Sequence, residues 1–120
     1  MLKPNVLEAL NNQLNAEMVS SYLYMSMAAH FESRNLHGMA TWMHAQAREE
    51  WGHSMKFFNY IVERNGDVAL QAIDAPQAKW DNVLKMFQDA YKHEVYVTGR
   101  IHELVKLATS ENDFATLAFL

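Results

Sequence analysis

Long stretches of the sequence contain no residue that breaks a helix. Pro4 fits the first turn of a helix, where its missing N–H has no cost, and neither Gly nor Pro follows until Gly38. The chain has only four Gly and two Pro in 120 residues, and strong helix formers such as Ala, Leu, Met, Glu and Gln are plentiful. The sequence therefore predicts an all-α protein, with a single domain over residues 1–120.

Turn signals divide the chain into three long helices and the start of a fourth. Asn65-Gly66 is a good helix stop, Pro76 interrupts the pattern that follows, and Asp81 can cap the next helix. A short polar turn separates the first two helices. The expected helices cover about residues 4–34, 37–65 and 81–110, with a fourth opening at 114–120.

The linker between the second and third helices decides the topology. About fifteen residues of extended chain reach roughly 50 Å, slightly more than a helix of about 29 residues. The linker can therefore cross the full length of a bundle and leave the second and third helices parallel. This connection differs from a simple up-down-up-down bundle.

Composition excludes several classes of function. The absence of Cys rules out disulfides and thiolate metal sites, so any metal must bind to oxygen and nitrogen ligands. The net charge of −4 and the lack of a basic cluster argue against nucleic acid as a partner. No segment approaches the roughly twenty apolar residues that span a bilayer, and the N-terminus has no signal-peptide pattern. We expect no membrane association and a cytoplasmic location.

Spacing of three and four residues defines one largely apolar seam on each long helix. Glu17 interrupts the first seam, Glu50 and His53 interrupt the second, and Glu94 interrupts the third. The seam positions are Leu7, Leu10, Leu14, Glu17, Ser21, Tyr24, Ala28 and Phe31, then Leu36, Met39, Met43, Gln46, Glu50, His53, Phe57 and Tyr60, and finally Trp80, Val83, Phe87, Ala90, Glu94, Val97, Ile101, Leu104 and Ala108.

The depth of the seam carboxylates points to a metal site. Glu17, Glu50 and Glu94 each lie about thirteen residues, or roughly 20 Å, inside a helix of about thirty residues. The middle of a helix lies at the same level of a bundle whichever direction the helix runs. We therefore expect the three glutamates to meet His53 in the interior. Unpaired buried charges cost several kcal/mol each, and the seams carry no Lys or Arg. A pair of metal ions bridged by a glutamate would compensate, and this ligand set suits iron better than zinc.

Several short segments resemble signatures of the bacterial non-haem ferritins, and the resemblance covers the whole chain. It implies a ferritin-like four-helix bundle with a non-haem di-iron centre. Bacterioferritin is a poorer match, because Gly52 stands where its haem-ligand methionine is expected and a second E-x-x-H is absent. The segments are Glu17, Tyr24, Glu49-Glu50-Trp51-Gly52-His53 and Tyr91-Lys92-His93-Glu94.

The resemblance implies roles for four ligands. Glu17, Glu50 and His53 would hold the first iron. Glu50 would also bridge to a second iron, which Glu94 holds as well. By the same resemblance these residues are the catalytic centre of a ferroxidase.

Two further matches and one departure complete the comparison with the family. Glu49 matches a position used for a third, weaker iron site near the storage cavity, and Tyr24 matches the tyrosine beside the di-iron centre. The family takes its remaining ligands from the middle of helix four, whereas this sequence ends at Leu120. We therefore expect a fourth helix that is truncated or missing and a domain that is incomplete at its C-terminus.

The expected function is iron storage and detoxification. Fe(II) would be oxidised by dioxygen or peroxide and stored as ferric mineral in a hollow homo-oligomeric shell, which in this family has twenty-four subunits. The alternative is a truncated fragment with structural or assembly properties and little ferroxidase activity. A rubrerythrin-like peroxidase or a twelve-subunit DNA-protecting ferritin fits less well, since a second E-x-x-H is lacking and the crossover contains no obvious extra helix.

Simpler interpretations stand beside these. A lone E-x-x-H is weak evidence, Tyr24 can be an ordinary core tyrosine, and Glu49 can be a solvated helix residue. For Gly52 and Gly99, which fall inside predicted helices, close backbone approach is one reason to expect Gly. The remaining histidines are expected at surfaces or interfaces: His30, His37, His44, His93 and His102.

Overall fold

A computed structural model describes residues 1–120 and contains four α-helices and no strands. The helices are α1 (Pro4–Ser33), α2 (His37–Glu63), α3 (Val83–Ser110) and the short α4 (Phe114–Phe119). The prediction of three long helices and the beginning of a fourth is confirmed. The cap of α3 is Asn82 and not Asp81, because the Asn82 side chain accepts a hydrogen bond from the Lys85 N–H at 2.8 Å.

Two residues after the end of each long helix lies an asparagine in the left-handed region. Asn35, Asn65 and Asn112 have φ values of 59°, 61° and 54°. Asparagine reaches this region more easily than most residues, so these positions act as helix stops. Gly66 follows Asn65 for a different reason: an added Cβ would lie 2.8 Å from the Cδ1 of Leu7. The predicted stop is therefore present, but Asn65 makes the turn and Gly66 allows close packing.

The other mid-helix glycines have no such neighbour. An added Cβ at Gly52 or Gly99 meets nothing within 4 Å. The expectation that close backbone approach explains these two glycines is wrong for the isolated chain.

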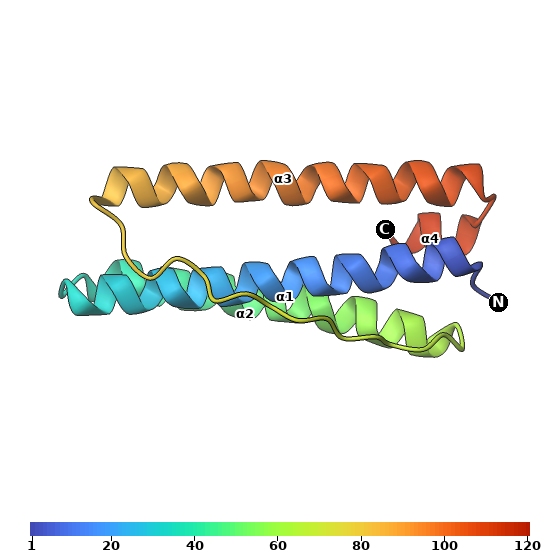
Figure 1. The fold of residues 1–120 in the computed structure, drawn as a ribbon, viewed down its shortest axis with the longest axis horizontal. Helices are drawn as coiled ribbons and strands as arrows, with labels where there is room; N and C mark the ends of the chain where they lie inside the picture. Colours follow the sequence, from blue (N-terminus) through green and yellow to red (C-terminus); the bar gives the residue numbers. More distant parts are fainter.

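The linker from α2 to α3 is a crossover that runs in extended form along α1 (Figure 1). It begins after α2 and returns the chain to the other end of the molecule, so α2 and α3 run parallel, as predicted. The side-chain amide of Asn11 on α1 makes two hydrogen bonds to the crossover backbone. Its Nδ2 donates to the Asp67 carbonyl at 3.0 Å, and its Oδ1 accepts from the Ala69 N–H at 2.8 Å. Farther along, Ser26 donates to the Gln77 carbonyl at 2.6 Å.

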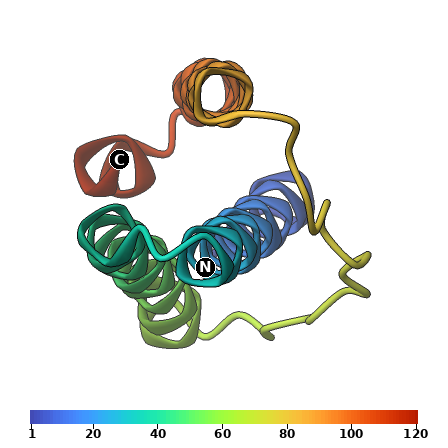
Figure 2. The ribbon, with the colours of Figure 1, turned by 90° about the vertical axis from the view of Figure 1, so that its left-hand side faces the viewer.

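Viewed from one end, the four helices take the four corners of a bundle (Figure 2). α1 packs against α2 along its length, α3 packs against α1, and α3 makes no close backbone contact with α2. α4 lies at the end of the bundle that holds the N-terminus (Figure 1). Phe119 of α4 stacks on Tyr60 of α2 with ring centroids 4.1 Å apart, and the Tyr60 hydroxyl lies 2.9 Å from the Thr116 hydroxyl.

The buried apolar side chains form two clusters, one toward each end of the bundle. The middle of α1 and α2, between the clusters, carries buried polar residues. No helix in the structure combines the length and the apolar composition that a membrane-spanning segment requires. One cluster contains Tyr24, Met27, Ala28, Phe31, Ala40, Met43, Ala47, Trp80, Met86 and Ala90, and the other contains Leu2, Val6, Leu10, Leu14, Phe57, Tyr60, Ile61 and Leu104.

The predicted seams hold best on α1, where every position except the partly buried Leu7 is buried. On α2 the seam is wrong at its first two positions, because Leu36 and Met39 are exposed. Ala40 and Ala47 are buried instead. Both alanines belong to an apolar cluster that α2 shares with α1. The buried face is therefore shifted from the predicted seam at the start of α2, whereas Met43, Glu50 and Phe57 are buried as predicted.

Candidate metal centre

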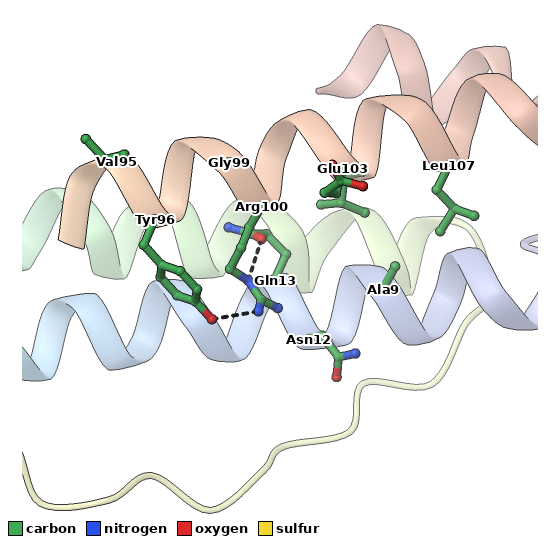
Figure 3. A pocket seen from close by; sticks show the side chains of 10 residues that line it. Ala9, Asn12, Gln13, Val95, Tyr96, Gly99, Arg100, Glu103 and Leu107 are labelled. Atoms are coloured by element: carbon green, nitrogen blue, oxygen red, sulfur yellow. Dashed lines mark hydrogen bonds between the residues drawn. The ribbon is translucent and has the colours of Figure 1, made fainter. Parts of the chain in front are cut away.

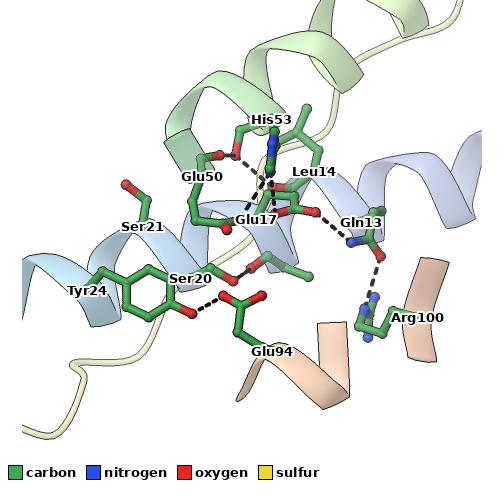
Figure 4. A network of polar contacts seen from close by, with 12 residues as sticks. Gln13, Leu14, Glu17, Ser20, Ser21, Tyr24, Glu50, His53, Glu94 and Arg100 are labelled. Atoms are coloured by element: carbon green, nitrogen blue, oxygen red, sulfur yellow. Dashed lines mark hydrogen bonds and ion pairs between the residues drawn. The ribbon is translucent and has the colours of Figure 1, made fainter. Parts of the chain in front are cut away.

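Three of the predicted ligands meet between the two apolar clusters. Glu17 of α1 is 3% exposed and Glu50 of α2 is 6% exposed, while His53 of α2 is partly buried. The Nδ1 atom of His53 lies 3.4 Å from Glu50 Oε2 and 3.6 Å from Glu17 Oε2. One ligand atom from each residue fits within a 4.8 Å cluster (Figure 4).

The carboxylate oxygens that face His53 have no hydrogen-bond donor. Glu17 Oε2 and Glu50 Oε2 are both buried without a partner. A buried carboxylate oxygen without a partner is costly, because neither water nor a donor replaces its lost hydration. Burial therefore raises the pKa of Glu50 to about 9, helped by the adjacent carboxyl of Glu17 and by the charges of Glu94 and Glu49.

This donor set fits a metal ion. Two carboxylate oxygens and one imidazole nitrogen converge from two helices, and no Lys or Arg forms an ion pair with either carboxylate. A cation placed among these atoms would satisfy both unpartnered oxygens at once. Carboxylate and imidazole ligands together suit first-row metals such as iron.

Glu94 reaches the same pocket but not the three-residue cluster. It lines a pocket of about 330 Å³ together with Glu17, Glu50 and His53. Its side chain is exposed, so the expectation that it is buried with the other carboxylates is wrong. The reason is the packing of α3, which contacts α1 but not α2 and so leaves the side of Glu94 open.

Tyr24 connects this open side to the interior of the bundle. The side chain is 2% exposed, and its hydroxyl donates a hydrogen bond to Glu94 Oε1 (Figure 4). Burial raises the pKa of Tyr24 well above its usual value, and the hydrogen bond and negative charge of Glu94 add to the shift. The hydroxyl therefore stays protonated and holds one oxygen of Glu94.

Glu49 lies outside the cluster. It is exposed on α2 and does not line the pocket, although its charge contributes to the raised pKa of the adjacent Glu50. The structure therefore places it where a solvated residue or a peripheral metal ligand would lie.

Two polar contacts near the centre involve residues that the predicted seams do not include. Gln13 is 1% exposed and donates from Nε2 to Glu17 Oε1 at 3.0 Å; its position four residues before Glu17 is the signal that sequence reasoning could have used. Ser20, which is 1% exposed, lies 2.6 Å from Nε2 of His93 on α3. No local pattern predicts that second contact, because it joins residues 73 positions apart.

Two histidines differ from the surface or interface placement expected of them. His30 is 8% exposed and meets the Trp80 ring edge-on at 5.6 Å. His93 is partly buried, and burial lowers its pKa against the opposing charges of Glu94 and Glu17. Both lie off the seams that face the centre of the bundle but still pack between elements.

Comparison with known proteins places the chain in a family. A model of the ferritin-like domain matches residues 7–120. The chain belongs to the ferritin family. This ferritin is 38% identical over 120 residues to the bacterial non-heme ferritin of Staphylococcus aureus, an alignment that covers all of this chain and 72% of that relative. The bacterial non-heme ferritin of Bacteroides fragilis is also 38% identical, with 76% of its length covered.

Solved ferritin structures have the same fold. The open pore ferritin of the hyperthermophilic archaeon Archaeoglobus fulgidus matches with a TM-score of 0.97 and 49% identity, over 99% of this chain and 74% of that one. A closed form engineered from the A. fulgidus ferritin also matches with a TM-score of 0.97. The predicted ferritin-like, all-α architecture with its long crossover is confirmed.

Proposed function

We propose that this chain is an iron-storage subunit that oxidises Fe(II) at the centre built around Glu17, Glu50 and His53. The observation that carries the proposal is the pair of buried oxygens, Glu17 Oε2 and Glu50 Oε2, which face one imidazole and lack any hydrogen-bond donor. Membership in the ferritin family supports iron storage in general.

The proposed centre takes two iron ions as substrate. Glu17 and His53 hold one Fe(II), Glu50 bridges to a second, and Glu94 holds the second ion from the edge of the same pocket. Tyr24 supports this arrangement through its hydrogen bond to Glu94. Glu49 is assigned a peripheral, weaker iron position, in keeping with its exposed place beside Glu50.

The proposed reaction moves one electron from each of two Fe(II) ions to a shared oxidant. Dioxygen takes up two electrons and two protons and leaves as hydrogen peroxide; if hydrogen peroxide is the oxidant, it takes up two electrons and two protons and leaves as two water molecules. Carboxylate oxygens favour the Fe(III) product, because hard ligands bind the more highly charged ion better. The ferric product is then stored as mineral inside a cytoplasmic shell, for which we propose twenty-four copies.

Aerobic iron oxidation tests the proposal. Fe(II) added to the purified chain should be oxidised at a rate that saturates with iron and exceeds the buffer rate, and particle mass should report a large assembly. Glu50→Gln and Glu17→Gln should each lower the saturable rate by about 10-fold or more, since effects of this size already follow from changes outside the ligand set. Glu8→Gln, an exposed change at one end of α1, is the matched control. A parent rate equal to that of buffer would contradict the proposal.

Metal binding without oxidative turnover is the second candidate function. The observation that favours it is the exposure of Glu94, which leaves the second metal position with fewer converging ligands than the first. Under this alternative the chain binds one divalent ion per centre and oxidises Fe(II) no faster than buffer. The stoichiometry of binding under anaerobic conditions separates the two candidates.

A further inference from the structure

A polar chain of two residues connects the outer groove of the molecule to Glu17. The groove lies between α1 and α3, and Arg100 reaches across it from α3 to the buried amide of Gln13 (Figure 3). The Nε of Arg100 donates to Gln13 Oε1 at 3.3 Å, and Gln13 Nε2 donates to Glu17 Oε1 at 3.0 Å. Figure 4 shows the same chain running from α3 to the metal centre.

The chemistry of Arg100 fixes the orientation of the amide. A guanidinium group has only donors, whereas a glutamine amide has one accepting end and one donating end. The oxygen of Gln13 must therefore face Arg100, and its NH₂ group must face Glu17. Without Arg100 the buried amide could turn over and present its oxygen to the Glu17 carboxylate, where two acceptors would repel each other.

Arg100 is itself held in place on α3. Its Nη1 donates to the Tyr96 hydroxyl at 3.0 Å, and its guanidinium carbon lies 5.6 Å from the centre of the Tyr96 ring. Arg100 forms no ion pair with a carboxylate. Its guanidinium is therefore directed at the amide of Gln13 and not at a competing acid.

As a result, the two carboxylate oxygens of Glu17 have different environments. Oε1 is occupied by Gln13, while Oε2 is buried without a partner and lies 3.6 Å from His53 Nδ1. We propose that Gln13 and Arg100 are positioning residues, which turn Glu17 so that Oε2 faces the metal. This inference rests on the proposed function, because it assumes that a metal binds among Glu17, Glu50 and His53.

The contacts also join two helices that each carry a proposed ligand. Gln13 and Glu17 lie on α1, while Arg100 and Glu94 lie on α3. A purely structural tie would stabilise this packing but would not change how Glu17 binds a metal. The test must therefore measure metal coordination as well as stability.

Co(II) binding to the full 120-residue chain supplies such a readout, because its visible absorption bands change with coordination geometry. Gln13→Leu removes both hydrogen bonds and should weaken Co(II) binding by about 10-fold or more, with shifted bands. Arg100→Met should weaken binding in the same direction. Arg100→Lys should restore most of the loss, because ammonium, like guanidinium, can only donate.

Combining the variants tests whether Arg100 acts through Gln13. Arg100→Met should have no further effect on Co(II) affinity in the Gln13→Leu background. Glu103, which lines the same groove but forms no hydrogen bond with Gln13, provides the matched control, and Glu103→Gln should bind Co(II) like the parent. Thermal unfolding of every variant separates lost stability from lost coordination, and Arg100→Met keeps the test decisive if Gln13→Leu does not fold.

Three outcomes would overturn the inference. If Gln13→Leu lowers the unfolding temperature but leaves Co(II) affinity and bands unchanged, Gln13 and Arg100 only stabilise the packing of α1 and α3. Additive losses in the double variant would show that Arg100 does not act through the amide. If the parent chain binds no Co(II) at the centre, as judged against Glu17→Gln, the proposed function fails as well, whereas parent binding with unaffected variants overturns this inference alone.

Discussion

At the scale of single residues, Glu50 is a carboxyl group buried beside other acids. It is 6% exposed, its Oε2 has no donor, and the carboxyl of Glu17 lies beside it. Burial is the first cause of its raised pKa of about 9, and the neighbouring acids add to it. The metal-free centre therefore favours a protonated Glu50, whereas a bound cation requires the carboxylate form.

This shift makes the stability of the metal-free chain depend on pH. Glu50 loses its proton near pH 4.5 when unfolded and near pH 9 when folded, so between these values the folded state binds the additional proton. The contribution of Glu50 to the free energy of unfolding should therefore be fully present below about pH 4.5. It should decrease as pH rises toward about 9. Urea unfolding across that range, with a chelator present, measures the decrease.

Glu50→Gln removes the titrating group and should flatten this part of the stability profile. Glu8→Gln provides the matched control, because Glu8 is exposed on the same bundle and its substitution should leave the parent profile unchanged. A decrease that persists undiminished in Glu50→Gln would assign the pH dependence to other groups.

At the scale of elements, the crossover lacks secondary structure of its own and is tied to α1 by side-chain hydrogen bonds. Asn11 is 6% exposed and serves both as donor and as acceptor to the crossover backbone. Asn12, the next residue, makes an exposed contact to the side chain of Gln71 at 2.6 Å. These neighbouring asparagines therefore offer a direct comparison between a buried and an exposed anchor.

Asn11→Ala should lower the free energy of unfolding by about 1–3 kcal/mol, because it removes two hydrogen bonds to the crossover backbone that are each worth about 0.5–1.5 kcal/mol. Asn12→Ala should change it by about 0.5 kcal/mol or less. Chemical denaturation gives both values. Proteolysis of the crossover should also become faster in Asn11→Ala alone, and equal effects of the two substitutions would mean that Asn11 is not the anchor.

At the scale of the whole molecule, a polar layer divides the hydrophobic core. Apolar clusters lie on both sides of Glu17 and Glu50 along the bundle, which limits the access of water to these carboxylates. Under the proposed function, the same layer that weakens the metal-free bundle would give a metal ion its binding energy. Metal affinity and folding stability would then be linked through the same two carboxylates.

Divalent metal should consequently stabilise the folded chain. Co(II) at about 100 times its dissociation constant should raise the free energy of unfolding near neutral pH by about 2.7 kcal/mol. Differential scanning calorimetry measures the gain. Glu17→Gln should abolish most of it, while His37→Ala should not, because His37 pairs with Glu32 at an exposed site away from the centre. An equal gain in Glu17→Gln would show that the stabilising metal binds elsewhere.

Much of this architecture could be predicted because it depends on local pattern. Breaker positions gave the three long helices, the length of the linker gave the crossover, and helical spacing placed Glu17, Glu50 and His53 on facing surfaces. The errors are equally specific. Glu94 is exposed, and Asn82 caps α3 in place of Asp81.

The sequence by itself determined the helices, their order and the position of each acid along its helix, since these follow from contacts within one helix or one turn. Only the tertiary structure decided how far each helix is rotated and which neighbour it touches. Packing of α3 on α1 and not on α2 leaves Glu94 open and brings Arg100 to Gln13, 87 residues away. Helical periodicity is a local property, whereas the rotation of one helix against another is set by side-chain packing between segments far apart in the chain.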